Sequence, residues 1–133
     1  MVPTKPTRSE RAVLLTCLVG GILLFAIGVR YMTAPEAAAL TFGIPRRPQA
    51  LELHYVTGLR NMWLGGLAIA FALFRDWRAL ALWFAFAAVV CFADAFVAAN
   101  SVGRWPHIAF HAGCGLASVG LSVASWRSHL KGG

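Results

Sequence analysis

Four long apolar segments alternate with short polar segments along this chain. The apolar segments extend over about residues 12–31, 51–74, 79–99 and 106–126. A helix needs about 20 residues to cross the hydrocarbon core of a bilayer, and each segment is close to that length. The pattern therefore predicts an all-α polytopic membrane protein, with four transmembrane helices in an antiparallel bundle that forms one domain over residues 1–133.

The polar segments contain signals for the starts of helices. Thr7 and Glu10 have the spacing of a capping box, so the first helix is expected to begin directly after Thr7. Thr33 and Pro35 form a second start, because proline suits the first turn of a helix. The apolar residues 37–42 that follow are too few to span a membrane. They predict a short interfacial helix between the first two spans.

Composition supports the membrane class. Hydrophobic residues make up 59% of the chain and charged residues 13%, whereas soluble domains carry about 25% charged residues. These values exclude a disordered chain and a small secreted domain held by disulfides. The three cysteines, Cys17, Cys91 and Cys114, lie inside apolar segments and form no Cys-x-x-Cys motif. They are interpreted as small core residues.

The excess of positive charge predicts an orientation. The net charge is +7, but the basic residues lie in the short gaps between spans, so nucleic-acid binding is not expected. One side of the predicted bundle carries Lys5, Arg8, Arg11, Arg75, Arg78, Arg127 and Lys131, and the other carries Arg30, Arg46, Arg47 and Arg104. Positive residues concentrate on the cytoplasmic side. This favours a bacterial inner-membrane protein with both termini in the cytoplasm.

Three ionisable residues stand out because they lie deep inside the predicted spans: Arg60, Asp94 and His111. Such residues are costly in hydrocarbon and mark functional sites with a specific partner. A rise of about 1.5 Å per residue places Arg60 about 13 Å, and the other two about 7–8 Å, below the outer ends of their helices. All three are predicted catalytic residues of a polar pocket in the outer half of the bundle. The alternative is that Arg60 and Asp94 form an intramembrane ion pair that only fixes helix register.

The remaining polar residues have types and spacings that do not indicate one particular function. Five are predicted to contact a substrate: Glu52, Tyr55, Asn61, Trp63 and His107. His107 and His111 share a helix face and could chelate a metal with Asp94 or Glu52, or ligate haem with His54. The glutamate that makes such a helix specific for zinc proteases is missing, so no metal and no cofactor is predicted. Small residues are interpreted as contact points between helices: Gly20, Gly21, Gly28, Gly58, Gly65 and the serines from Ser118 to Ser125.

Several short motifs resemble one family. They are the stretch from Gly58 to Gly66, Phe42 to Pro45, Asp94 late in the third span and His111 early in the fourth. Together they resemble a family of small four-helix integral membrane proteins of bacteria and fungi, catalogued as a domain of unknown function. The resemblance covers about residues 12–126. It implies the four-span fold and singles out Arg60, Asp94 and His111, but it supplies no reaction.

Three functions remain open at this point. The preferred one is acid–base catalysis of an isomerase, cyclase or hydratase type on a lipophilic small molecule, because the pocket has proton-transfer groups and no nucleophile motif. The second is a proton-coupled small-molecule transporter that acts as a homodimer. The third is a non-catalytic accessory membrane subunit whose glycine faces bind a partner. The bilayer is an expected partner of all three.

Overall fold

The computed structural model describes residues 6–42, 51–101 and 104–132. These residues form five helices and no strand: α1 (Arg8–Thr33), α2 (Pro35–Phe42), α3 (Leu51–Phe74), α4 (Trp77–Ser101) and α5 (Trp105–Gly132). All but the short α2 are long and apolar enough to cross a membrane. The all-α fold, the four spans and the short helix between the first two are therefore confirmed. The motif from Gly43 to Pro45 lies outside the described residues.

Local hydrogen bonds set the helix ends. The Thr7 amide donates to Glu10 Oε2 at 2.7 Å, and the Glu10 amide donates to Thr7 Oγ1 at 3.3 Å, which is the predicted capping box. Between α3 and α4, Arg75 takes the left-handed conformation with a φ of 56°. The Asp76 carboxylate then accepts from the Ala79 amide at 3.0 Å and caps α4. This short turn sends α4 back alongside the rest of the bundle.

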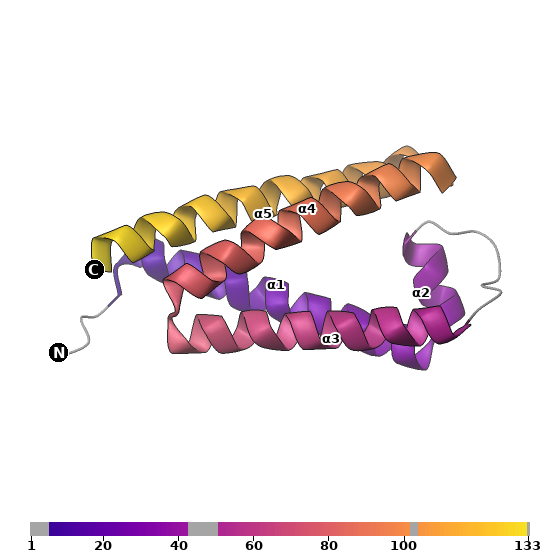
Figure 1. Cartoon of the computed structure of the whole chain (residues 1–133), viewed down its shortest axis with the longest axis horizontal. Helices are drawn as coiled ribbons and strands as arrows, with labels where there is room; N and C mark the ends of the chain where they lie inside the picture. Colours follow the sequence, from indigo (N-terminus) through magenta and orange to yellow (C-terminus); the bar gives the residue numbers. More distant parts are fainter. Residues whose placement is uncertain (1–5, 43–50, 102–103, 133) are drawn as a thin grey trace.

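The long helices are arranged as two antiparallel pairs, α1 with α3 and α4 with α5 (Figure 1). The pairs lie together at the end that holds the α3–α4 turn and both chain termini, and they diverge toward the opposite end. There α2 lies between them. The polar site described below is at this diverging end.

Glycines allow the backbones of α1 and α3 to touch. A Cβ atom on Gly28 would lie 2.6 Å from the carbonyl oxygen of Gly58, and one on Gly65 would lie 2.6 Å from that of Gly21. These four contact positions are confirmed. Gly20 was expected to be another, but a Cβ there would meet no atom within 4 Å. One residue turns a helix by about 100°, so Gly20 points away from the contact that its neighbour Gly21 makes.

Serines and a glycine line the contact between α4 and α5. The Ser122 hydroxyl donates to the Ala81 carbonyl at 2.8 Å, and Ser118 and Ser125 are buried. A Cβ on Gly115 would lie 2.8 Å from the Phe92 ring. The predicted packing face of the fourth span is therefore confirmed, with close approach by small residues.

The remaining surface suits a hydrocarbon solvent. The buried apolar cluster consists of Leu14, Cys17, Ala72, Leu80 and Phe84, where the two pairs meet. Large apolar side chains such as Phe74, Phe86 and Phe96 are more than two-thirds exposed instead. Water would disfavour this surface, whereas lipid chains solvate it. The chain is thus built as an integral membrane protein.

Candidate functional site

A cavity lies at the diverging end of the two helix pairs. Its volume is about 120 Å³. Three elements form its wall: α1 contributes Ile27, Arg30 and Tyr31, α2 contributes Ala38, Thr41 and Phe42, and α5 contributes Phe110 and His111. The sequence break at Thr33 to Pro35 turns the chain back, so that α2 closes this end. The wall is mostly apolar and contains few polar groups, as is usual for small-molecule sites.

His111 lines this cavity, whereas the other two predicted catalytic residues, Arg60 and Asp94, are not among its lining residues. Its side chain is buried, with 8% of its surface exposed. The ring centroid lies 4.5 Å from that of Phe42 on α2 and 5.5 Å from that of Phe110, which it meets edge-on. Two aromatic rings therefore hold the imidazole at the cavity wall. A histidine side chain in such a place can act as a general acid or base toward a bound molecule.

Asp94 approaches the same region from α4. Its side chain is half-buried, and His111 and Arg60 are the described ionisable groups near enough to act on it electrostatically. In the part of the chain that the structure describes, Asp94 forms no ion pair within 4.0 Å with either group. The three predicted catalytic residues are thus brought into one electrostatic environment. They interact across a gap rather than through a direct salt bridge.

Arg60 itself lies on an exposed part of α3. The contacting ion pair that could fix the register of α3 against α4 is therefore not formed among the described residues. The helix that packs closely on α3 is α1, through glycines, and α4 contacts α5 instead.

Tyr31 and Arg30 are site residues that the sequence analysis missed. Tyr31 is 7% exposed, lines the cavity and lies within the electrostatic influence of Asp94, Arg60 and Arg30. Its ring centroid is 5.9 Å from that of His54 on α3. The Arg30 Nη2 atom donates to the Ala37 carbonyl at 3.5 Å and so joins α1 to α2. One feature of the sequence could have indicated them: both residues lie just before the helix break at Thr33 to Pro35, where the chain turns back.

The residues predicted to contact a substrate lie away from this cavity. Glu52, Tyr55 and Trp63 are exposed on α3, while Asn61 and His107 are half-buried. None of these five is among the described residues that line the cavity. Glu52 and Tyr55 lie near the start of α3 and His107 near the start of α5, whereas Asn61 and Trp63 lie near the middle of α3.

Metal ligands do not cluster in the described residues. No group of three or more His, Cys, Asp and Glu side chains is placed there to hold a metal ion. His107 and His111 share a face of α5, but only His111 lines the cavity.

Comparison with known proteins finds a match between this chain and the model of one protein family. A family model described as "Domain of unknown function (DUF4267)" matches residues 21–125. This range includes every residue of the cavity wall together with Arg60 and Asp94. No curated protein and no solved structure matches the chain.

Proposed function

We propose that this chain, which belongs to that family of unknown function, catalyses an acid–base reaction on a lipophilic small molecule within the membrane. The reaction is of the isomerase, cyclase or hydratase type, in which protons move and no covalent intermediate is needed. The observation that carries the proposal is the buried His111 imidazole on the wall of a mostly apolar cavity, with Asp94 in its electrostatic field.

Each group has a role that its position supports. His111 removes a proton from the substrate and returns it to another atom. The Asp94 carboxylate stabilises the imidazolium that forms in between, because opposite charges attract strongly where water is excluded. Arg30 and Arg60 orient a polar oxygen of the substrate, and Tyr31 supplies a hydroxyl donor. The apolar part of the substrate occupies the space beside Ile27 and Phe42.

The test compares His111→Gln and Asp94→Asn with wild type in the native host. Lipid extracts are analysed by untargeted mass spectrometry, and we expect one substrate to accumulate and one product to disappear in both variants. His129→Gln is the matched control, because His129 lies near the far end of α5, beside Trp126. Unchanged extracts from variants that remain folded would refute catalysis by this site.

A proton-coupled transporter is the second candidate, and the divergence of the two helix pairs favours it (Figure 1). Two weakly joined halves can rock against each other, which exposes a central site to each side in turn. Protein reconstituted in liposomes distinguishes the two candidates. Asp94-dependent proton flux driven by a substrate gradient, with the substrate recovered chemically intact, supports transport rather than catalysis. A homodimer is part of this second proposal.

The same positive-charge asymmetry supports a placement in the bacterial inner membrane with both termini in the cytoplasm. Both termini lie at the end that holds the α3–α4 turn (Figure 1), and the described basic residues Arg75, Arg78, Arg127 and Lys131 are at this end too. Under this placement the cavity is in the outer half of the bilayer. Substrate would then enter from the outer leaflet.

A further inference from the structure

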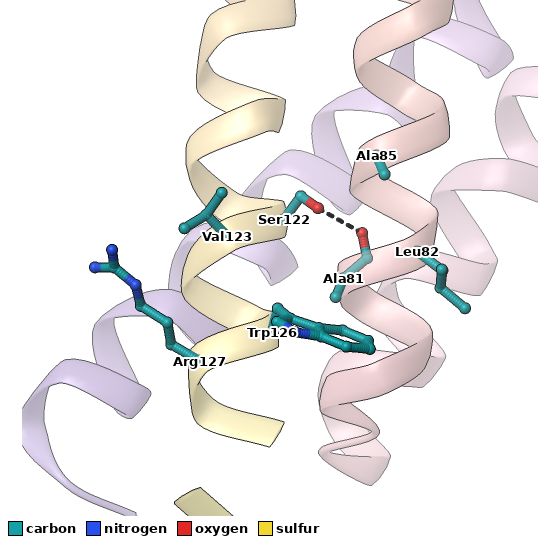
Figure 2. Close-up of a pocket in the computed structure, with 7 residues that line it drawn as sticks. All are labelled: Ala81, Leu82, Ala85, Ser122, Val123, Trp126 and Arg127. Atoms are coloured by element: carbon teal, nitrogen blue, oxygen red, sulfur yellow. Dashed lines mark hydrogen bonds between the residues drawn. The ribbon is translucent and has the colours of Figure 1, made fainter. Parts of the chain in front are cut away.

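A second concavity lies between α4 and α5, at the end of the bundle opposite to the cavity. It is a groove of about 280 Å³ (Figure 2). Ala81 and Ala85 on α4 and Ser122, Trp126 and Arg127 on α5 are among its lining residues. No residue of the proposed reaction site belongs to it.

Small side chains create this groove and leave it apolar. The Ser122 hydroxyl donates to the Ala81 carbonyl at 2.8 Å, so α4 and α5 approach closely here. Ala81 and Ala85 have no side chain long enough to fill the surface between the helices. Because the serine hydroxyl is already satisfied by the backbone, the floor presents methyl and methylene groups. Such a floor suits hydrocarbon and disfavours a polar ligand.

The lower end of the groove has the features of a membrane interface. The Trp126 ring extends from α5 toward α4 and lies across this end, whereas Arg127 extends from the other flank of α5 (Figure 2). Both side chains are exposed. Tryptophan concentrates where lipid chains meet headgroups, with its N–H in the polar layer. Trp126 therefore indicates the boundary of the hydrocarbon, and Arg127, the next residue toward the chain end, is a flexible exposed cation beside this boundary.

Charge at this end favours an anionic headgroup. The exposed basic residues of the described chain here are Arg8, Arg11, Arg75, Arg78, Arg127 and Lys131. Two described acids, Glu10 and Asp76, lie at this end, so the six basic residues outnumber them. The field at the mouth of the groove is therefore positive. Basic pockets between transmembrane helices select anionic lipids over zwitterionic ones.

We propose that the α4–α5 groove is a binding site for one anionic phospholipid of the surrounding bilayer. One acyl chain lies along the floor at Ala81 and Ala85, and the phosphate pairs with Arg127. This site is independent of the proposed reaction at His111, because it lies at the other end of the bundle and shares no residue with that cavity.

Native mass spectrometry of the protein released from detergent micelles tests the proposal. Dioleoyl phosphatidylglycerol and dioleoyl phosphatidylcholine are added separately, and the fraction of lipid-bound protein is measured against concentration. We expect tighter binding of phosphatidylglycerol to wild type. Arg127→Gln should weaken that binding about fivefold, the usual effect of one basic residue near a membrane surface, and leave phosphatidylcholine unchanged. Ala85→Phe fills the groove and should weaken both.

Two matched controls separate this site from diffuse attraction. Arg78→Gln removes the same charge from the same end but outside the groove, and Ala117→Phe adds the same ring to an exposed position of α5. Arg78→Gln should weaken phosphatidylglycerol binding much less than Arg127→Gln does, Ala117→Phe should bind like wild type, and circular dichroism confirms that all variants are helical. Equal losses from Arg78→Gln and Arg127→Gln would overturn the proposal, as would unchanged binding by Ala85→Phe. A wild-type dimer that Ala85→Phe dissociates would overturn it too, since a second copy would then occupy the groove.

Discussion

Gly28 on α1 and Gly58 on α3 bring two membrane-spanning backbones into direct contact, with 2.6 Å between a Cβ built on Gly28 and the Gly58 carbonyl oxygen. The contact repeats one heptad away at Gly21 and Gly65. Seven residues make nearly two helical turns, so both glycines of each helix face the partner helix. This pair of contacts holds the half of the bundle that carries Tyr31 and Arg60.

Substitution of Gly28 by alanine should therefore destabilise the protein. The added methyl group meets backbone atoms of Gly58 and Met62, which cannot move aside as a flexible side chain would. Overpacking of this kind costs about 1–3 kcal/mol of unfolding free energy. Titration with sodium dodecyl sulfate, followed by circular dichroism in mild detergent, measures the change.

Gly20→Ala is the matched control for this substitution. It makes the same chemical change in the same helix at a position with no neighbour within 4 Å. Alanine favours helix over glycine by about 0.5–1 kcal/mol, so Gly20→Ala should leave stability unchanged or raise it slightly. Equal destabilisation by both variants would contradict the backbone contact.

Substitution by alanine should change the free energy of unfolding differently at two serines of α5. Ser122→Ala removes the hydrogen bond to the Ala81 carbonyl and should cost about 0.6 kcal/mol, a typical value for a hydrogen bond between membrane helices. The buried Ser125 hydroxyl forms no hydrogen bond in the described part of the chain, and only the weakly polar Cys17 thiol lies beside it. Ser125→Ala should therefore be neutral or stabilising, because it removes an unsatisfied polar group. The same detergent titration compares the two, and a larger loss at Ser125 would be the contrary result.

The fold was largely predictable because hydrocarbon thickness and backbone hydrogen bonding act locally on the sequence. Apolar segments of about 20 residues can only be spanning helices, and the Thr7 cap and Pro35 fix where helices start. The pairing of α1 with α3 was less accessible. It depends on glycine pairs with equal spacing on two separate helices, Gly21 with Gly28 and Gly58 with Gly65. The equal seven-residue spacing of these glycines can be recognised only when the sequences of the two helices are compared with each other.

The candidate site was predictable only in part. Asp94, His111 and Arg60 stood out because charge in hydrocarbon is costly wherever it occurs. Tyr31 and Arg30 did not, since residues at the end of an apolar segment usually anchor a helix at the interface. Here α2 folds back over them and buries Tyr31, and this placement is a tertiary event that the local pattern does not record.

Phe42 should shield His111 from water. Its ring on α2 contacts the imidazole at a centroid distance of 4.5 Å, so Phe42→Ala opens the cavity wall. We expect diethyl pyrocarbonate to modify His111 several-fold faster in this variant, as measured by mass spectrometry of peptides. Phe96→Ala is the control, because Phe96 is 71% exposed on α4. Identical modification rates in the two variants would show that α2 does not cover the site.

The orientation of the chain can be tested with single cysteines. In a background with Cys17, Cys91 and Cys114 replaced by alanine, one cysteine is placed at Arg104 and another at Lys131, which lie at opposite ends of α5. Both side chains are exposed, so each new thiol can react. If positive charge holds the termini inside, a membrane-impermeant maleimide should label Arg104→Cys in intact cells and Lys131→Cys only after lysis. The reverse pattern would place His111 and its cavity in the cytoplasmic half of the bilayer, and substrate would then reach the site from inside the cell.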